Sequence, residues 1–402
     1  MPRPFPPLAM SARTAVSAMG AGVAVTREAL HERRGGLRPA TLPGGPEGGI
    51  WVGQVPGLED AALPPALAGF ECRNNRLAEL ALGTDGFGDA VAGAARRLGA
   101  DRVAVVLGTS TSGIAETEAA FTRRGEDGAL PGSFNYDGTH DLYALARFVR
   151  ARLGLRGPAA TLSTACTSGA RSFLQAAFMI DAGLCDAAVV GGVDTLCNMT
   201  LRGFASLELL SRGPCRPCAT DRDGISVGEA AGFVLLERAG RADDAGGVRL
   251  LGAGATSDGH HMSSPHPEAL GAVGAMRAAL DAAGLAPERV DYVNLHGTGT
   301  RANDAMEDRA VHRVFGDAVP CSSTKGWSGH TLGASGALEA VIAAICIEDG
   351  LVPGCLGVER ADPGFNADVA TANRAAPVRR VVSNSFGFGG SNCSLVFGGP
   401  GA

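Results

Sequence analysis

The sequence predicts an α/β protein made of two related halves. Its 402 residues, of which 45% are hydrophobic and 19% charged, can bury a large core and are too many for one simple layer. The 59 glycines suit the tight strand-to-helix turns of an α/β fold, because glycine tolerates positive φ and close backbone approach. Internal similarity points to the two halves.

Two pairs of similar segments follow one another in the same order along the chain. VAVVLGTSTSG (103–113) resembles YVNLHGTGT (292–300), and TLSTACTSGA (161–170) resembles VVSNSFGFGGS (381–391). In each segment an apolar strand runs into a turn of small residues. This pattern indicates an internal duplication.

The boundary between the halves is predicted in a Gly-rich loop. This loop, at 239–247, lies between the two sets of similar segments, and no low-complexity linker divides the chain elsewhere. We therefore expect an N-terminal half over residues 1–245 and a C-terminal half over residues 246–402.

Two helices are predicted from apolar residues spaced three and four apart. The first covers residues 170–178, directly after Cys166, and ends before Gly183. The second covers residues 334–345, and Gly350 lies where a C-terminal cap is expected. Cys166 is thereby placed at a strand-to-helix junction.

The composition excludes several classes of partner. A net charge of −6 and a pI near 5.8 disfavour nonspecific nucleic-acid binding, which depends on clustered cations. Aromatic residues at 5% argue against a carbohydrate-binding or nucleic-acid-binding face. An acidic protein partner would therefore need a local basic patch.

The distribution of apolar residues and cysteines predicts a cytoplasmic protein. No apolar run is long enough for a signal peptide or for a membrane span of about 20 residues. The ten cysteines are scattered, as expected for reduced thiols. Cys215 and Cys218 form a lone CxxC without the second ligand pair of a structural zinc site, so no metal site is predicted.

Cys166 is a candidate nucleophile. At the first turn of a helix, a thiol faces unpaired backbone N–H groups and the positive end of the helix dipole, and both favour the thiolate. The alternative is an ordinary buried cysteine in a turn of small residues.

Two histidines and one lysine occupy similar positions near turns. His296 follows the strand VDYVNL, so its imidazole should project from the carboxyl edge of a sheet. His330 lies in STKGWSGHTLG, just before a predicted helix, and Lys325 is five residues earlier. Lys325 is the only lysine, and arginine cannot replace its compact ammonium group in a tight site.

Asp304 and Glu307 are spaced to share one face of a short helix. Solvated surface carboxylates are the default interpretation. A pairing of Glu307 with Lys325 is the alternative, and it would hold the lysine in place and charged.

Four motifs in this order make the chain similar to a known family. They are STACTSGA around Cys166, NLHGTGTRAND around His296, SSTKGWSGHTLGASGALEA around Lys325 and His330, and SNSFGFGGSNCSLVFG near the end. The chain thus resembles the elongating β-ketoacyl-[acyl carrier protein] synthases, condensing enzymes of the thiolase superfamily. The segments CRNNRL, HMSSPHP and GFASLEL resemble the aryl polyene biosynthesis subgroup.

The resemblance implies a fold and a reaction. The fold is the thiolase fold, with a mixed five-stranded sheet in each half and αβαβα layers. Cys166 would accept the acyl chain and condense it with malonyl-carrier protein as CO2 leaves, with the backbone N–H groups of Cys166 and Phe388 as the oxyanion hole. His296 and His330 would donate hydrogen bonds to the enolate, and Lys325 and Glu307 would support them. Phe388 would be the mobile gate.

The resemblance also implies binding residues. Thr298 and Thr300 match positions that bind the pantetheine arm, although capping of the turn is an alternative, and Ser263 belongs to the same substrate-binding set. No cofactor is required. A structural monovalent cation would bind at four further positions: Asn294, Glu339, Ser383 and Asn384.

The expected partner is the acyl carrier protein, which is acidic. Arg73 and Arg76, three apart in ECRNNRLAEL, are candidates for docking it, with Arg123 and Arg124 as the alternative. The chain would form a homodimer, or a heterodimer with a related subunit.

Three competing functions are weighed against the motifs. A noncatalytic subunit of the chain-length-factor kind would lack the nucleophile, a degradative thiolase would carry a second cysteine in a CxGxG-like segment, and an initiating synthase would use Cys, His and Asn.

In RDGISVGEAAG, Ile225 and Ala230 depart from the family pattern, which leaves the acyl chain length open.

Overall fold

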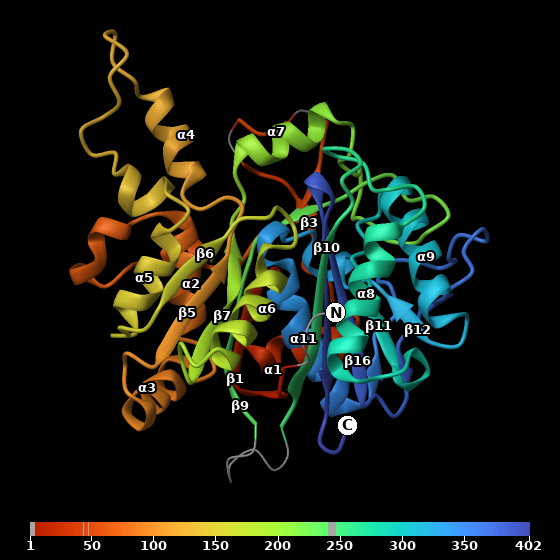
Figure 1. Ribbon diagram of the computed structural model, residues 1–402. Helices are drawn as coiled ribbons and strands as arrows, with labels where there is room; N and C mark the ends of the chain where they lie inside the picture. The colour runs from red at the N-terminus through yellow and green to blue at the C-terminus, as the bar shows by residue number, and fades with distance from the viewer. Residues whose placement is uncertain (1–4, 43, 47, 240–246) are drawn as a thin grey trace.

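The protein folds into five layers in a computed structural model that describes residues 5–42, 44–46, 48–239 and 247–402 (Figure 1). Two β-sheets enclose a central pair of helices, and further helices cover the outer face of each sheet. The αβαβα architecture implied by the sequence is confirmed. None of the helices in the described ranges is long and apolar enough to cross a membrane.

The sheet of the N-terminal half has five strands. In spatial order they are β6 (Ala159–Leu162), β5 (Val103–Gly108), β7 (Ala187–Asp194), β9 (Ala230–Arg238) and β1 (Leu8–Ser17). β5 pairs in parallel with both β6 and β7, whereas β9 is antiparallel to both β7 and β1. The central strands are continuous apolar runs, as expected for strands buried on both faces.

The sheet of the C-terminal half repeats this arrangement. In spatial order its strands are β12 (Pro320–Ser322), β11 (Tyr292–Asn294), β16 (Arg380–Gly387), β17 (Ser391–Gly398) and β10 (Arg249–Ser257). A short strand, β14 (Asp368–Val369), extends its edge beyond β12. β1 and β10 touch at Leu8↔Leu250 and Ala9↔Arg249, so the two sheets are continuous at that corner.

The two halves have the same strand order and the same strand directions, which confirms the duplication. The first, second, third, fourth and fifth strands of each half lie in the order 3-2-4-5-1. The first predicted pair of similar segments is correct, because β5 and β11 are both second strands. The second pair is wrong: β6 is a third strand and corresponds to β12, whereas β16 corresponds to β7. The predicted boundary between residues 245 and 246 lies outside the described residues.

Amphipathic helices form the outer layers. The N-terminal sheet is covered by α2 (Arg73–Leu82), α3 (Phe87–Leu98) and α5 (Ala144–Arg152), whose apolar residues share one core with that sheet. The C-terminal sheet is covered by α8 (Leu270–Ala283) and α9 (Arg301–Phe315), which form a second core.

The remaining elements are short or lie at the periphery. The helices are α1 (Val23–Glu32), α4 (Ile114–Thr122), α7 (Asn198–Ser206) and α10 (Lys325–Ser328). The strands are β2 (Gly20–Ala21), β3 (Arg38–Pro39), β4 (Trp51–Gly53), β8 (Val227–Gly228), β13 (Leu351–Val352) and β15 (Arg374–Ala375).

Two helices form the central layer, and both were predicted from the sequence. α6 (Ser168–Asp181) and α11 (Ser335–Asp349) lie between the sheets at the middle of the molecule (Figure 1). α11 is buried on every side over residues 335–346, because it packs against both sheets and α6. Gly350 takes φ +61° and caps it, as expected.

The first turns of α6 and α11 approach one another at backbone distance. A Cβ on Gly169 would lie 2.6 Å from the carbonyl oxygen of Gly333, and a Cβ on Gly336 would lie 2.7 Å from both the backbone nitrogen and the Cβ of Ala170. These two glycines are the second residues of their helices. The absence of side chains at both positions therefore allows the two helix starts to meet.

Gly336→Ala should destabilise the protein by about 1–3 kcal/mol, because its new methyl group has to displace backbone atoms of α6. Gly203→Ala in α7 is the matched control, since no atom of the described residues outside its own helix turn lies within 4 Å of the Cβ it would add. Urea unfolding of both variants would measure the difference. Equal stabilities would show that α6 and α11 are not in backbone contact.

Candidate active site

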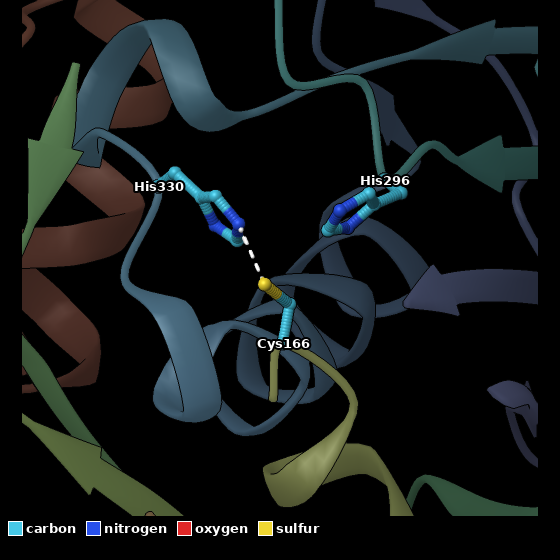
Figure 2. A group of neighbouring side chains, drawn as sticks. All are labelled: Cys166, His296 and His330. Atoms are coloured by element: carbon cyan, nitrogen blue, oxygen red, sulfur yellow. Dashed lines mark hydrogen bonds between the residues drawn. The ribbon is translucent and has the colours of Figure 1, made fainter. Parts of the chain in front are cut away.

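A cavity of about 220 Å³ opens beside the starts of α6 and α11. Cys166, His296 and His330 line it, and their sulfur and ring nitrogens lie within 4.8 Å of one another (Figure 2). Other lining residues, mostly apolar, include Phe204, Leu207, Leu209, Ile225, Phe386 and Phe388. The three chemical groups predicted from separate parts of the sequence therefore form one site.

Cys166 lies in the sharp turn between β6 and α6, directly after Ala165, whose φ is +53°. Its Sγ is 3.1 Å from Nε2 of His330. Burial raises the pKa of Cys166 to about 12, and the effects of Lys325 and of backbone N–H groups in the opposite direction are smaller. The predicted preference for thiolate is therefore wrong for the resting site, because desolvation outweighs the helix terminus. The thiol needs a proton acceptor, and His330 is in place for that role.

Backbone N–H groups face the sulfur from two segments. Hydrogen bonds from the N–H groups of Phe388 and of Cys166 itself lower the pKa of the thiol. Phe388 directly follows β16, and Gly389 and Gly390 after it have φ values of +81° and +74°. The Phe388 ring is 36% exposed and contacts Phe204 at 5.7 Å between ring centroids. Phe388 is therefore at the cavity wall, where the resemblance placed a gate.

His330 is held on both sides. Its backbone N–H donates to Ser226 at 2.7 Å, and its backbone oxygen accepts from Gly228 at 2.9 Å. Its Nδ1 lies 3.1 Å from Oγ of Ser335, the first residue of α11. Burial, followed by the charge of Lys325, lowers the pKa of His330 well below its usual range. The imidazole is therefore neutral at physiological pH and can accept the thiol proton.

His296 completes the cluster from the other side of the cavity. It follows β11, and its ring centroid lies 5.1 Å from that of His330 at an interplanar angle of 83°. Burial, Lys325 and His330 lower its pKa well below the usual range. Among the described residues, its Nδ1 has no hydrogen-bond partner. Two neutral imidazoles thus face the cavity beside the thiol.

Glu307 positions His296 through the backbone. Its carboxylate accepts the N–H groups of His296 and Gly297 at 2.8 and 2.7 Å, and the side chain of Asn384 at 3.2 Å. Burial raises the pKa of Glu307 to about 7, although the backbone hydrogen bonds oppose the shift. The default interpretation of solvated carboxylates is wrong, because Asp304 and Glu307 are both buried on α9.

Lys325 pairs with Glu339 and not with Glu307, which corrects the alternative drawn from the sequence. Its Nζ lies 2.6 Å from Oε1 of Glu339, and both side chains are almost completely buried. Glu339 is on the second turn of α11, whereas the carboxylate of Glu307 is directed to the turn after β11. The charge of Lys325 lowers the pKa of Cys166, His296 and His330, so it acts on the whole cluster.

The predicted substrate-binding residues line the same cavity. They are Ser263, Thr298 and Thr300. Thr300 also caps α9, because its Oγ1 accepts the N–H of Asn303 at 3.3 Å, and it lies 3.0 Å from Oγ1 of Thr298. The two alternatives for these threonines are therefore compatible.

The predicted docking arginines are engaged elsewhere. Arg73 forms ion pairs with Glu59 and the buried Glu229, so its charge is neutralised inside the fold. Arg76 is paired with Glu71. Neither arginine is among the residues that line the cavity. The geometry therefore argues against Arg73 as a docking cation.

Cys215 and Cys218 belong to no cluster of three metal ligands in the described part of the chain. The Sγ of Cys215 donates to the backbone oxygen of Lys325 at 3.2 Å, and the backbone N–H of Cys218 donates to Asp304 at 2.8 Å. The CxxC therefore packs behind the site.

Asp194 is a site-building residue that was missed from the sequence. It is fully buried at the end of β7 and accepts hydrogen bonds from Thr109 at 2.7 Å, from the backbone N–H of Thr111 at 2.9 Å and from the N–H of Gly333 at 2.6 Å. It thereby ties the end of β5 to the turn between His330 and α11. The sequence feature that could have identified it is the aspartate at the end of the otherwise apolar run AAVVGGVD.

Comparisons with known proteins give a consistent result. The sequence matches the family models described as "Beta-ketoacyl synthase, N-terminal domain" over residues 87–242 and "Beta-ketoacyl synthase, C-terminal domain" over residues 248–359. It is 34% identical to a 3-oxoacyl-[acyl-carrier-protein] synthase 2 of Vibrio cholerae, covering 74% of this chain and 76% of that protein.

Two further relatives differ in the share of their length that is matched. A 3-oxoacyl-[acyl-carrier-protein] synthase 2 of Coxiella burnetii is 39% identical over 62% of this chain, and the match spans 63% of that protein, under two thirds of its length. A chain in the structure of a ketosynthase in complex with its chain length factor from Xenorhabdus doucetiae superimposes on this protein with a TM-score of 0.88. The two sequences are 38% identical, and the match covers 98% of this chain and 98% of that chain.

Lys325→Ala should destabilise the protein by about 3–5 kcal/mol, because it leaves the Glu339 carboxylate buried without its counterion. The double variant Lys325→Met, Glu339→Leu should recover most of that loss, since it buries no charge. Arg374→Ala breaks a largely exposed pair with Asp368 and is the control, with an expected loss below about 1 kcal/mol. Urea unfolding would measure all three, and similar losses for Lys325→Ala and Arg374→Ala would contradict the buried pair.

Proposed function

The chain belongs to the β-ketoacyl synthase family, and we propose that it condenses a Cys166-bound acyl group with malonyl-carrier protein, releasing CO2. The observation that carries this proposal is the cluster of one buried thiol and two neutral imidazoles. The Sγ of Cys166 lies 3.1 Å from Nε2 of His330, and the ring centroids of His330 and His296 are 5.1 Å apart. This arrangement serves both acyl transfer and decarboxylation.

The first step is acyl transfer to Cys166. His330 Nε2 takes the thiol proton as the sulfur attacks the carbonyl carbon of the acyl thioester. The N–H groups of Cys166 and Phe388 stabilise the oxyanion of the tetrahedral intermediate, and each such donor is typically worth about 3 kcal/mol. The carbon–sulfur bond to the carrier then breaks, and the departing thiolate takes the proton back from His330.

The second step requires His330 to become a donor. Ser335 makes this possible, because its hydroxyl can accept a hydrogen bond from Nδ1 or donate one to it. When the hydroxyl donates, the imidazole proton sits on Nε2 and faces the cavity. His296 and His330 then donate to the thioester oxygen of the malonyl group.

Carbon–carbon bond formation follows from loss of CO2. The bond to the malonyl carboxylate breaks, and its electron pair forms an enolate whose oxygen the two imidazoles stabilise. The enolate carbon attacks the acyl carbon on Cys166, and the carbon–sulfur bond breaks to return the thiolate, which takes up one proton from solvent. No base removes a carbon-bound proton, because the loss of CO2 itself supplies the electron pair.

A noncatalytic chain-length-factor role is the second candidate, and the cluster of Cys166, His296 and His330 argues against it. We infer instead that the chain pairs with a second ketosynthase-like subunit, identical or related. The complex from Xenorhabdus doucetiae, whose two proteins are a ketosynthase and its chain length factor, supports this inference. The ten cysteines, all free thiols, suit a reducing cytoplasm.

The acyl carrier protein is the proposed substrate carrier, and exposed cations near the cavity would dock it. Arg123 and Arg124 become the stronger candidates, because both are exposed at the end of α4 and α4 packs against α7. α7 carries Phe204 of the cavity wall. Arg76 remains the candidate on α2.

A structural monovalent cation fits the C-terminal half. Asn294 is fully buried, and neither its side-chain oxygen nor its nitrogen has a hydrogen-bond partner among the described residues. Oε2 of Glu339 is likewise unpartnered. We propose that these oxygens hold the cation together with Ser383 and Asn384, and that the cation supports the fold without entering the reaction.

His296→Ala and His330→Ala should fail at different steps. His296→Ala should still load an acyl group on Cys166 but release CO2 from malonyl-carrier protein about 10²–10³-fold more slowly, because one enolate donor is lost. His330→Ala should slow both steps, since it removes the proton acceptor of the thiol as well. Mass spectrometry of the acyl-enzyme and capture of CO2 would separate the steps.

Cys166→Ala is the control for loading and should carry no acyl group. Normal acyl loading in His330→Ala would contradict its role as proton acceptor. Unchanged CO2 release in both histidine variants would overturn the condensation mechanism.

Potassium should raise the thermal stability of the protein relative to choline at equal ionic strength, by on the order of 1–3 kcal/mol at saturation. Asn294→Ala should abolish this gain. Asn74→Ala is the matched control, because Asn74 is also a buried asparagine whose side-chain atoms lack hydrogen-bond partners in the described part of the chain. Thermal unfolding in the two salts measures the effect, and an equal response of all three proteins would contradict the cation site.

A further inference from the structure

The active-site cluster has the composition of a zinc site. Zinc binds thiolate and neutral imidazole in tetrahedral sites, and a site with three protein ligands leaves the fourth position for water. Cys166, His296 and His330 offer one sulfur and two nitrogens within 4.8 Å of one another. We propose that the free protein binds one Zn²⁺ ion through these three side chains, and that the bound ion reversibly blocks the nucleophile.

The Cys166–His330 pair needs little adjustment to hold the ion, whereas the ring nitrogen of His296, within 4.8 Å of the other two ligand atoms, has to approach them to about 3.5 Å. Zinc–sulfur and zinc–nitrogen bonds of about 2.3 and 2.0–2.1 Å place the two ligand atoms about 3.5 Å apart at a tetrahedral angle. The Sγ of Cys166 and Nε2 of His330 are 3.1 Å apart, so they have to separate by only a few tenths of an ångström. The three side chains come from different segments and point toward a common space (Figure 2). The cavity beside them has room for the water ligand.

The histidines are prepared for metal binding. Both rings line the cavity, so a ring nitrogen of each can reach an ion there. Ser335 contacts Nδ1 of His330, which is the kind of outer contact that orients a metal-binding imidazole through its second nitrogen. Nδ1 of His296 is buried and without a partner among the described residues, so no hydrogen bond fixes that ring against a small rotation.

The charges near the sulfur allow a divalent ion. Lys325 opposes a cation, but its ammonium group is paired with Glu339 at 2.6 Å. Asp194 acts on Cys166 with the opposite sign to Lys325. When Zn²⁺ binds, the thiol proton leaves for solvent and a zinc–sulfur bond takes its place, so one positive charge of the ion is neutralised.

The ligand set selects the metal. Thiolate and imidazole ligands favour zinc and similar borderline ions. Hard cations such as Mg²⁺ should not compete, since they prefer oxygen ligands.

The inhibition selects one state of the catalytic cycle, and this part of the inference rests on the proposed function. Acylated Cys166 has no thiolate to offer, so the acyl-enzyme loses the sulfur ligand and should not bind zinc. Zinc would then inhibit the protein while Cys166 is unacylated and would not inhibit the acyl-enzyme.

Titration of the full chain with Co²⁺ as a spectroscopic substitute tests the site without any measurement of condensation. One equivalent should bind, with a thiolate-to-metal absorption band and the intense visible bands of a tetrahedral ion, and Zn²⁺ should displace it. Alkylation of Cys166 by iodoacetamide should become at least about tenfold slower when Zn²⁺ is bound, because the metal occupies the sulfur. Mg²⁺ should leave the alkylation rate unchanged.

Matched variants locate the ion. Cys166→Ser should lose the thiolate band, and His296→Ala should weaken binding at least about tenfold. Cys185→Ser should bind as the wild type does, since Cys185 lies beyond the far end of α6, a helix about 20 Å long. Unfolding curves would show that each variant is folded.

The outcomes separate this inference from the proposed function. No thiolate band in the wild type, or an unchanged band in Cys166→Ser, would overturn the zinc site whether or not the protein condenses acyl chains. Zinc binding by a protein that fails to condense would uphold the site and reject the function. Zinc binding after acylation of Cys166 would overturn the selectivity for the unloaded state.

Discussion

The active site depends on the contact between the first turns of α6 and α11. Gly169 and Gly336 allow the two helix starts to approach at backbone distance, and the turns that precede them carry Cys166 and His330. A side chain at either glycine would push these turns apart. Because equivalent helices of the two halves meet here, the duplication places Cys166 and His330 at the centre of the molecule.

Burial determines the protonation states of the site. Desolvation keeps Cys166 as a thiol and His296 and His330 as neutral imidazoles, although an ammonium group lies near all three. Glu339 faces the buried Nζ of Lys325 from α11 at 2.6 Å. A site of neutral donors in a low dielectric suits a reaction in which negative charge first appears on an enolate oxygen.

Much of this was predictable from the sequence, because helix periodicity and local motifs are properties of short segments. Apolar spacing correctly predicted both central helices, and the family resemblance carried by the motifs correctly implied the two-sheet fold and the proximity of Cys166, His296 and His330. The partner of Lys325 and the ion pairs of Arg73 were not, because they join segments far apart in the chain, as in Arg73 with Glu229. The thiolate prediction failed because helix geometry can be predicted locally, whereas the depth of burial depends on the whole fold.

The two halves contribute different groups to the site. In the C-terminal half, the turns after β11, β12 and β16 carry His296, Lys325 with His330, and Phe388. At the corresponding places in the N-terminal half are Thr109, directly after β5, and Asp194, the last residue of β7, and the Thr109 hydroxyl donates to the Asp194 carboxylate at 2.7 Å. Asp194 also holds Gly333, beside the strained Leu332, whose φ is +52°. The N-terminal half thus contributes Cys166 after β6 and otherwise supports the site, and its buried Asp194 carboxylate fixes the turn that leads from His330 into α11.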